Sequence, residues 1–256
     1  MIQDLESILD ELEREGFILI PGALDPEQTE EIRVHINQAR ENGWEEGLNE
    51  VGNMWFDSLL DREPETFGPL VGHESIRPVL EGMMGPQCQL RSFRAHINPG
   101  PYHQEWHLDF YGYWQEKRRA EKYRLAVPPV GVNTTFYFQD NGPGIAHLKF
   151  IKRGHTFEPG HLEEDPFDRA KFEAWCEAQE HVVIHPKAGD CVVFISHIPH
   201  QGVKEDDDAE RSNVVCHYQL TPMYEGAWFV STARGYEGTF PFATDARPSR
   251  TPLKTG

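Results

Sequence analysis

The chain has 256 residues, 38% of them hydrophobic, which is enough to form the core of one sizeable domain. Its 42 acidic and 24 basic residues give a formal net charge of -18, so nucleic acid and anionic membranes are disfavoured as partners. The cysteines lack CxxC spacing and indicate neither a disulfide framework nor a thiolate zinc site; they are Cys88, Cys176, Cys191 and Cys216.

The first part of the chain, residues 1–85, is expected to be mainly helical. Apolar residues at helical spacing predict a helix within residues 3–14 that ends at Gly16, followed by a strand at residues 17–20. Asp25 and Pro26 are typical of a helix start, and this helix should run to about Arg40. Short helices are expected around residues 55–60 and 73–84. The N-terminus lacks the features of a signal peptide, and no apolar run approaches the roughly 18 residues of a membrane span, so we expect a cytoplasmic monomer or homodimer.

The middle of the chain reads as a series of short strands separated by Gly, Pro, Asn and Asp. The expected strands are residues 88–97, 131–139, 147–151, 181–184, 191–196 and 213–221, with a helical insertion at 165–178. Helices followed by many short antiparallel strands favour a jelly roll, or a related double-sheet barrel, flanked by helices. We expect one domain over residues 1–256, with a β-rich core at about 86–222 and a C-terminal tail at 223–256.

The segment around His107 and Asp109 carries the first indication of chemistry. On an extended segment these two side chains point to the same face, so one metal ion can bind both. His103 lies four residues before His107, but Pro99-Gly100-Pro101 upstream disfavours the helix that a zinc-binding His pair would need. Two histidines and one carboxylate form the ligand set of non-haem Fe(II) enzymes, which keeps positions open for a cosubstrate and O₂.

The third ligand is expected beyond the apolar strand 191–195, where either His197 or His200 could serve. Arg211 begins the next strand, and a hairpin about the acidic loop between them would bring position 200 near position 211. A guanidinium beside the metal suits a dicarboxylate cosubstrate, because one end can chelate iron while arginine binds the far carboxylate. We therefore predict that Arg211 anchors 2-oxoglutarate.

Further polar residues share the faces of these strands. Asn213 and His217 lie on the same face as Arg211, where they either contact cosubstrate or substrate or form an ordinary interior polar pair. Thr135 is a candidate to help bind 2-oxoglutarate. Arg91 and Arg94 should lie on opposite faces of their strand, so at most one points inward.

The order and spacing of these motifs resemble the phytanoyl-CoA dioxygenase family of Fe(II)/2-oxoglutarate oxygenases. The resemblance runs from about Glu15 to Gln219 and is carried by residues 15–22, 106–109, 140–143, 153–155 and 189–190, and by Phe194, His200 and Arg211. It implies a double-stranded β-helix, or cupin-like jelly roll, with His107, Asp109 and His200 as the catalytic iron ligands. Members often have Gly-Ser after the distal histidine, whereas Gln201-Gly202 stands here.

The resemblance implies an oxygenase that uses Fe(2+), 2-oxoglutarate and O₂. The expected reaction is hydroxylation of an unactivated C–H bond of a small-molecule metabolite, with release of succinate and CO₂. Related halogenases have a small residue in place of the carboxylate, so Asp109 argues against halogenation. Two alternatives stay open: a desaturating or cyclising oxygenase of the same family, and a non-redox, metal-binding cupin-like isomerase or sugar-binding module.

Overall fold

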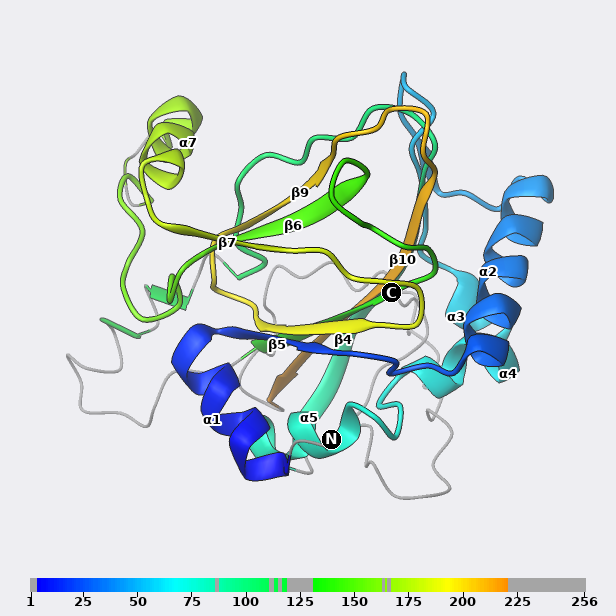
Figure 1. Ribbon diagram of the computed structural model, residues 1–256, viewed down its shortest axis with the longest axis horizontal. Coiled ribbons are helices and arrows are strands. Elements are labelled where there is room, and N and C mark those ends of the chain that lie inside the picture. The colour runs from blue at the N-terminus through cyan, green and yellow to red at the C-terminus, as the bar shows by residue number, and fades with distance from the viewer. Residues whose placement is uncertain are drawn as a thin grey trace, which may run out of the picture.

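Two antiparallel β-sheets form the body of the protein in the computed structural model, which describes residues 4–85, 88–110, 113–114, 117–118, 131–162, 164 and 167–220 (Figure 1). The larger sheet has the strand order β1-β8-β5-β10-β4-β3-β2, and the smaller one has the order β7-β6-β9. The strands of the larger sheet are β1 (Phe17–Ile20), β8 (Cys191–Ile195), β5 (Gly131–Tyr137), β10 (Arg211–Leu220), β4 (Cys88–Asn98), β3 (Met54–Phe56) and β2 (Gly47–Leu48). Those of the smaller sheet are β7 (His181–Ile184), β6 (Ala146–Ile151) and β9 (His200–Lys204).

Local sequence explains how the first helices begin and end. Helix α1 (Leu5–Glu15) is capped by the side chain of Asp4 and ends at Gly16, whose φ of 85° is left-handed. Helix α2 (Pro26–Glu41) starts with a capping box, in which Asp25 and Gln28 bind each other's backbone N–H groups. Shorter helices follow: α3 (Leu59–Arg62), α4 (Pro64–Phe67), the 3₁₀ turn η1 (Gly68–Leu70) and α5 (Arg77–Met84).

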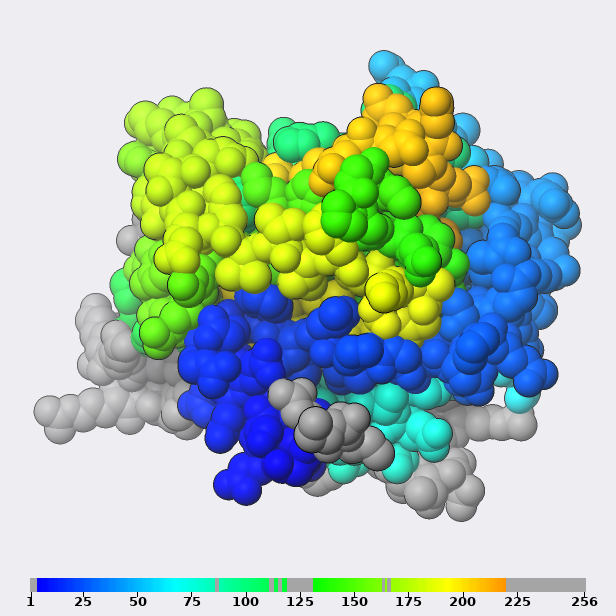
Figure 2. All heavy atoms as spheres, viewed as in Figure 1, coloured from blue at the N-terminus to red at the C-terminus, as the bar shows by residue number. Residues whose placement is uncertain are grey.

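The apolar core lies in layers on both sides of the larger sheet. One cluster joins the N-terminal helices to its outer face and includes Leu12, Ile36 and Phe93. A second cluster fills the space between the sheets, where Phe17 and Phe150 stack with ring centroids 4.4 Å apart. Helices α2 and α7 (Arg169–Glu177) lie at opposite ends of the molecule in Figure 1. Figure 2 shows the side of the molecule on which α1 and β1, in blue, lie against the yellow segment that contains β8. The fold is thus a mainly β jelly roll with flanking helices, as predicted.

The structure corrects several local predictions. The segment at Trp55 is strand β3 and not a helix, and the part expected to be mainly helical contributes β1, β2 and β3 to the larger sheet. The expected hairpin about the acidic loop is wrong, because β9 pairs with β6 whereas β10 pairs with β4 and β5. The acidic loop connects β9 of the smaller sheet to β10 of the larger sheet. Strand periodicity does not predict which strands pair, so it could not reveal this connection.

The remaining predictions fall partly outside the described residues. Helix α7 begins after its N-cap Asp168, and so occupies only the later part of the predicted 165–178 helix; residues 165 and 166 are not described. The predicted tail at 223–256 also lies outside the described residues. Within the part of the chain that is described, no helix has the length and apolarity to cross a membrane.

Gly16 offers a direct test of how α1 is docked. A Cβ at Gly16 would approach His155 Nδ1 to 2.3 Å and Ile198 Cδ1 to 2.9 Å, whereas a Cβ at Gly22, also left-handed at φ 59°, would meet nothing within 4 Å. We expect both Gly→Ala changes to lower the free energy of unfolding by about 1–2 kcal/mol through backbone strain, and Gly16→Ala to lower it by about 1–3 kcal/mol more through overlap. Urea unfolding of the two variants measures the difference; equal losses would contradict this packing.

Candidate metal centre

The two segments that carry the predicted ligands are joined through their backbones. The N–H of His107 donates to the carbonyl of His200 at 3.1 Å, and the N–H of His200 donates to the carbonyl of His107 at 3.0 Å. Gln104 and Tyr102 continue this pairing with Gly202 and Lys204. The segment before Asp109 therefore extends the smaller sheet along the free edge of β9, which places the imidazoles of His107 and His200 side by side, with ring centroids 4.1 Å apart.

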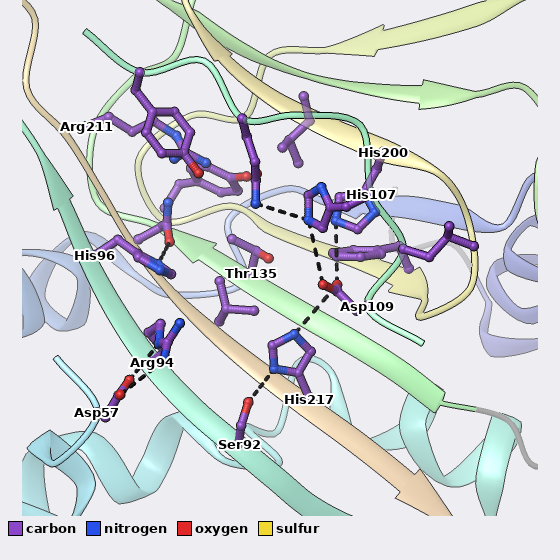
Figure 3. A pocket seen from close by; sticks show the side chains of 18 residues that line it. Asp57, Ser92, Arg94, His96, His107, Asp109, Thr135, His200, Arg211 and His217 are labelled. Carbon is purple, nitrogen blue, oxygen red and sulfur yellow. Dashed lines mark hydrogen bonds and ion pairs between the residues drawn. The ribbon is translucent and has the colours of Figure 1, made fainter. Parts of the chain in front are cut away.

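His107, Asp109 and His200 converge on one point (Figure 3). One potential ligand atom from each residue lies within 4.8 Å of the others. The Nε2 atom of His107 is 3.7 Å from Oδ1 of Asp109, and Nε2 of His200 is 3.5 Å from Oδ2. Two imidazoles and one carboxylate at these distances could hold one metal ion, and this combination of residues is the ligand set of facial iron sites.

Both histidines are oriented by hydrogen bonds to their own segments. Nδ1 of His107 contacts the carbonyl of Glu105 at 2.9 Å, and Nδ1 of His200 contacts the carbonyl of Ile198 at 3.0 Å. A carbonyl only accepts, so each Nδ1 carries the proton and each Nε2 lone pair is left to face the centre. Burial, together with the neighbouring His107, lowers the pKa of His200 to about 4, so its imidazole is neutral at pH 7.

Asp109 is the negative group of the cluster. Burial alone would raise its pKa, but the nearby imidazoles of His200, His217 and His107 hold the pKa of this carboxyl below its usual range. Its Oδ2 atom also accepts a hydrogen bond from the amide of Asn133. Asp109 is thus fixed as a carboxylate, which is the form that binds a metal.

Arg211 lies in the same cavity as His107, Asp109 and His200, away from the point on which these three side chains converge (Figure 3). It is buried, and its Nη1 donates to Oδ1 of Asn98 at 3.0 Å. With the Asn213 amide nitrogen turned toward His96, the amide oxygen accepts from both terminal nitrogens of Arg211 at 3.1 Å. The guanidinium carbon also lies 5.0 Å from the ring centroid of Tyr102 and 5.7 Å from that of Tyr137. Neutral groups therefore fix the guanidinium, and none of these contacts neutralises its charge.

A cavity of about 660 Å³ connects these groups. Its floor is the inner face of β4, β10 and β5, which contributes Ser92, Arg94, His96, Asn213, Val215, His217, Thr135 and Tyr137. The predicted Thr135 is therefore in the cavity, and of the arginine pair on β4 it is Arg94 that lines it. This is the size of a site for a small molecule.

Two of the histidines considered from sequence lie elsewhere. His197 is buried, its Nε2 contacts the carbonyl of His155 at 3.1 Å, and Tyr113 stacks on its ring. His103 contacts the amide of Gln201 through its Nε2 at 3.1 Å. Neither belongs to the His107, Asp109 and His200 cluster.

Sequence reasoning missed several polar residues around the centre, among them Asn133, Asn98, Asp57 and Gln104. Asn133 shares the inward face of its strand with Thr135, and this alternation is the one local signal that could have drawn attention to it. Asn98 accepts from Arg211 and Asp57 accepts from Arg94. Both contacts join different segments of the chain, so they could be found only once the strand pairing was known.

Comparison with known proteins gives a clear result for fold. No protein family model matches the chain, and no curated protein sequence is significantly similar to it. Among solved structures, the non-heme alpha ketoglutarate dependent epimerase SnoN from nogalamycin biosynthesis matches with a TM-score of 0.66 at 15% identity, covering 96% of this chain and 90% of its own. The carbocyclase SnoK from the same biosynthesis gives 0.65 at 17% identity, covering 84% and 83%. EctD from S. alaskensis gives 0.63 at 14% identity, covering 84% and 76%. At these identities the likeness shows a shared fold.

The cluster leads to a test that separates the two candidate distal histidines. We expect His200→Ala to weaken binding of Co(II), a spectroscopic substitute for Fe(II), by at least about 100-fold, because one of three ligands is lost. His197→Ala should leave the affinity within about twofold, since its ring faces Tyr113 and His155. Titration followed by visible absorption measures both, with thermal unfolding as the control for fold. A loss of affinity confined to His197→Ala would contradict the assignment.

Proposed function

We propose that the protein is an Fe(II)- and 2-oxoglutarate-dependent oxygenase that acts on a small molecule, with His107, Asp109 and His200 as the iron ligands. The observation that carries this proposal is the shared cavity, in which the His-Asp-His cluster and a buried arginine face the same space; among the described residues, the side chains that bind this arginine are neutral. A metal site without redox chemistry has no need of that arginine. The jelly-roll fold shared with SnoN, which has been crystallised with Fe³⁺, alpha ketoglutarate and nogalamycin RO, supports the same class.

The donor set fits iron on chemical grounds. Two neutral imidazole nitrogens and one carboxylate oxygen suit Fe(II), and thiolates, which would favour zinc or a cluster, are not near. In this structure Nε2 of His107 contacts the amide nitrogen of Gln104 at 3.0 Å, so a bound ion would replace that contact. When bound, iron and 2-oxoglutarate supply oxidative decarboxylation, which yields succinate and CO₂ and lets O₂ oxidise the substrate.

The arginine end of the cavity fits a carboxylate. Arg211 can pair with one carboxylate in a fork, and its two asparagine partners fix the plane of the guanidinium. Position 202, where members of the family that the sequence resembles often have serine, is occupied by Gly202. A Cβ there would lie 3.2 Å from Oε1 of Gln104 and 3.3 Å from Cε1 of Tyr102, so these side chains already fill the space of a serine.

Tyr137 is the best candidate to supply the hydrogen bond that serine would give. Its hydroxyl is buried and has no hydrogen-bond partner among the described residues. Burial raises the pKa of Tyr137 to about 12, so the hydroxyl keeps its proton and can donate to a carboxylate beside Arg211. A bound carboxylate would satisfy a polar group that is otherwise left unpaired. Thr135 and Asn213, on the same floor, complete the proposed cosubstrate site.

The part of the cavity floor that β4 contributes suits a polar but uncharged substrate. Arg94 pairs with Asp57 through two contacts, at 2.6 and 3.0 Å, so this pair brings no net charge to the cavity. Burial and the neighbouring Arg94 lower the pKa of His96 to about 3, which keeps this imidazole neutral. Ser92 adds a hydroxyl. This lining supports a small metabolite with hydrogen-bonding groups as the substrate. Hydroxylation is the reaction we propose; desaturation, ring formation or epimerisation would use the same ligands.

We predict that Arg211→Ala raises the concentration of 2-oxoglutarate needed for half-maximal succinate release by at least about 100-fold. Two charge-assisted hydrogen bonds of about 1.5–3 kcal/mol each are then lost, and 1.4 kcal/mol corresponds to a factor of ten. Tyr137→Phe, which removes one hydrogen bond, should raise it by about tenfold. The matched control is Arg40→Ala, which removes a surface partner of Glu210 and should change nothing. Succinate release that survives both His107→Ala and Arg211→Ala would overturn the proposed function.

A further inference from the structure

A row of polar side chains crosses the larger sheet directly beneath Asp109. Asn133 on β5 is the register partner of His217 on β10, which in turn is the partner of Ser92 on β4. Nδ1 of His217 contacts the hydroxyl of Ser92, and Nε2 of His217 lies 3.6 Å from Oδ2 of Asp109 (Figure 3). Through His217 this row reaches Oδ2, one of the two carboxylate oxygens of Asp109.

Asn133 makes the closest of these contacts. Its amide nitrogen donates to Oδ2 of Asp109, and its amide oxygen accepts from the hydroxyl of Ser196 at 2.8 Å. The side chain of Asn133 is completely buried. The carboxylate of Asp109 only accepts, so the N–H₂ end of the amide must face it, and the Ser196 hydroxyl then holds the oxygen end by donating to it.

Ser196 links this amide to the other half of the metal cluster. It directly follows β8 and begins the turn that leads to His200, and its carbonyl accepts from the N–H of Phe110, the residue next to Asp109. Position 131 must be small for this contact, because a Cβ on Gly131 would lie 2.7 Å from the Ser196 hydroxyl oxygen. The chain Ser196, Asn133, Asp109 thus ties the carboxylate to the turn that carries the distal histidine.

We propose that Asn133, oriented by Ser196, is a positioning residue that keeps Asp109 a one-oxygen ligand. The amide holds Oδ2, which also lies 3.5 Å from Nε2 of His200, so that Oδ1, 3.7 Å from Nε2 of His107, is the oxygen that would bind the metal. This inference rests on the proposed metal centre. Its chemical consequence is specific, because a carboxylate that bound through both oxygens would fill a coordination position that cosubstrate or O₂ requires. Partners of metal ligands typically change metal affinity by about 10- to 100-fold when they are removed.

The test compares three single variants in Co(II) and Fe(II) titrations without 2-oxoglutarate. Asn133→Ala should weaken metal binding by about 10-fold or more. Ser196→Ala, which frees the amide without removing it, should have a smaller effect in the same direction. Thr134→Ser is the matched control, because Thr134 is the fully buried neighbour of Asn133 on the same strand and makes none of these contacts; its affinity should stay within twofold.

A spectroscopic readout separates positioning from a merely structural role. At saturating Co(II), the visible absorption of Asn133→Ala should become weaker than that of the parent protein, since an added carboxylate oxygen raises the coordination number. A folded Asn133→Ala protein with unchanged affinity and spectrum would overturn the inference. If Asn133→Ala does not fold, Ser196→Ala decides, and unchanged affinity and spectrum there have the same meaning. Failure of the proposed function differs: the parent protein would then bind metal but show no response to 2-oxoglutarate.

Discussion

The two backbone hydrogen bonds exchanged by His107 and His200 are the contact on which the rest of the site depends. They join a segment that lies in no regular sheet to the edge of β9, and so convert ligands far apart in sequence into neighbours. Each imidazole is then held through Nδ1 by a carbonyl two residues before it. The metal-facing side of the cluster is therefore set by main-chain geometry, which side-chain substitutions elsewhere in the cavity do not easily disturb.

The larger sheet divides the cavity into regions with different chemistry. Rows of paired residues across β4, β10 and β5 place Asn98 beside Arg211 at one end, and Ser92 beside His217 and Asn133 at the other. In the proposed site, the first row would present Arg211 to a carboxylate of the cosubstrate, and the second row, through Asn133, would hold Asp109 toward the metal. Strand register fixes the spacing of these rows, so the fold sets the distance between the row of Arg211 and the row of His217.

Much of this site could be predicted from sequence, because its main parts are local. The spacing of His107 and Asp109 and the polar face of β10 needed only strand periodicity. The choice of His200 over His197 rested on the family resemblance. The structure pairs the backbone of His200 with that of His107 and places His197 against His155 and Tyr113. Asn98 and the Asp57–Arg94 pair could not be found, since each contact depends on which strands lie side by side. Strand alternation could place Asn133 on the inward face but could not name Asp109 as its partner. The expected hairpin failed for the same reason.

The most direct measurement of the central claim is anaerobic absorption spectroscopy of the Fe(II)-loaded protein during addition of 2-oxoglutarate. We expect a weak visible charge-transfer band that saturates at one equivalent of bound 2-oxoglutarate and that is absent from His200→Ala. Iron binding without any such band, or a band of unchanged strength in His200→Ala, would contradict the central claim.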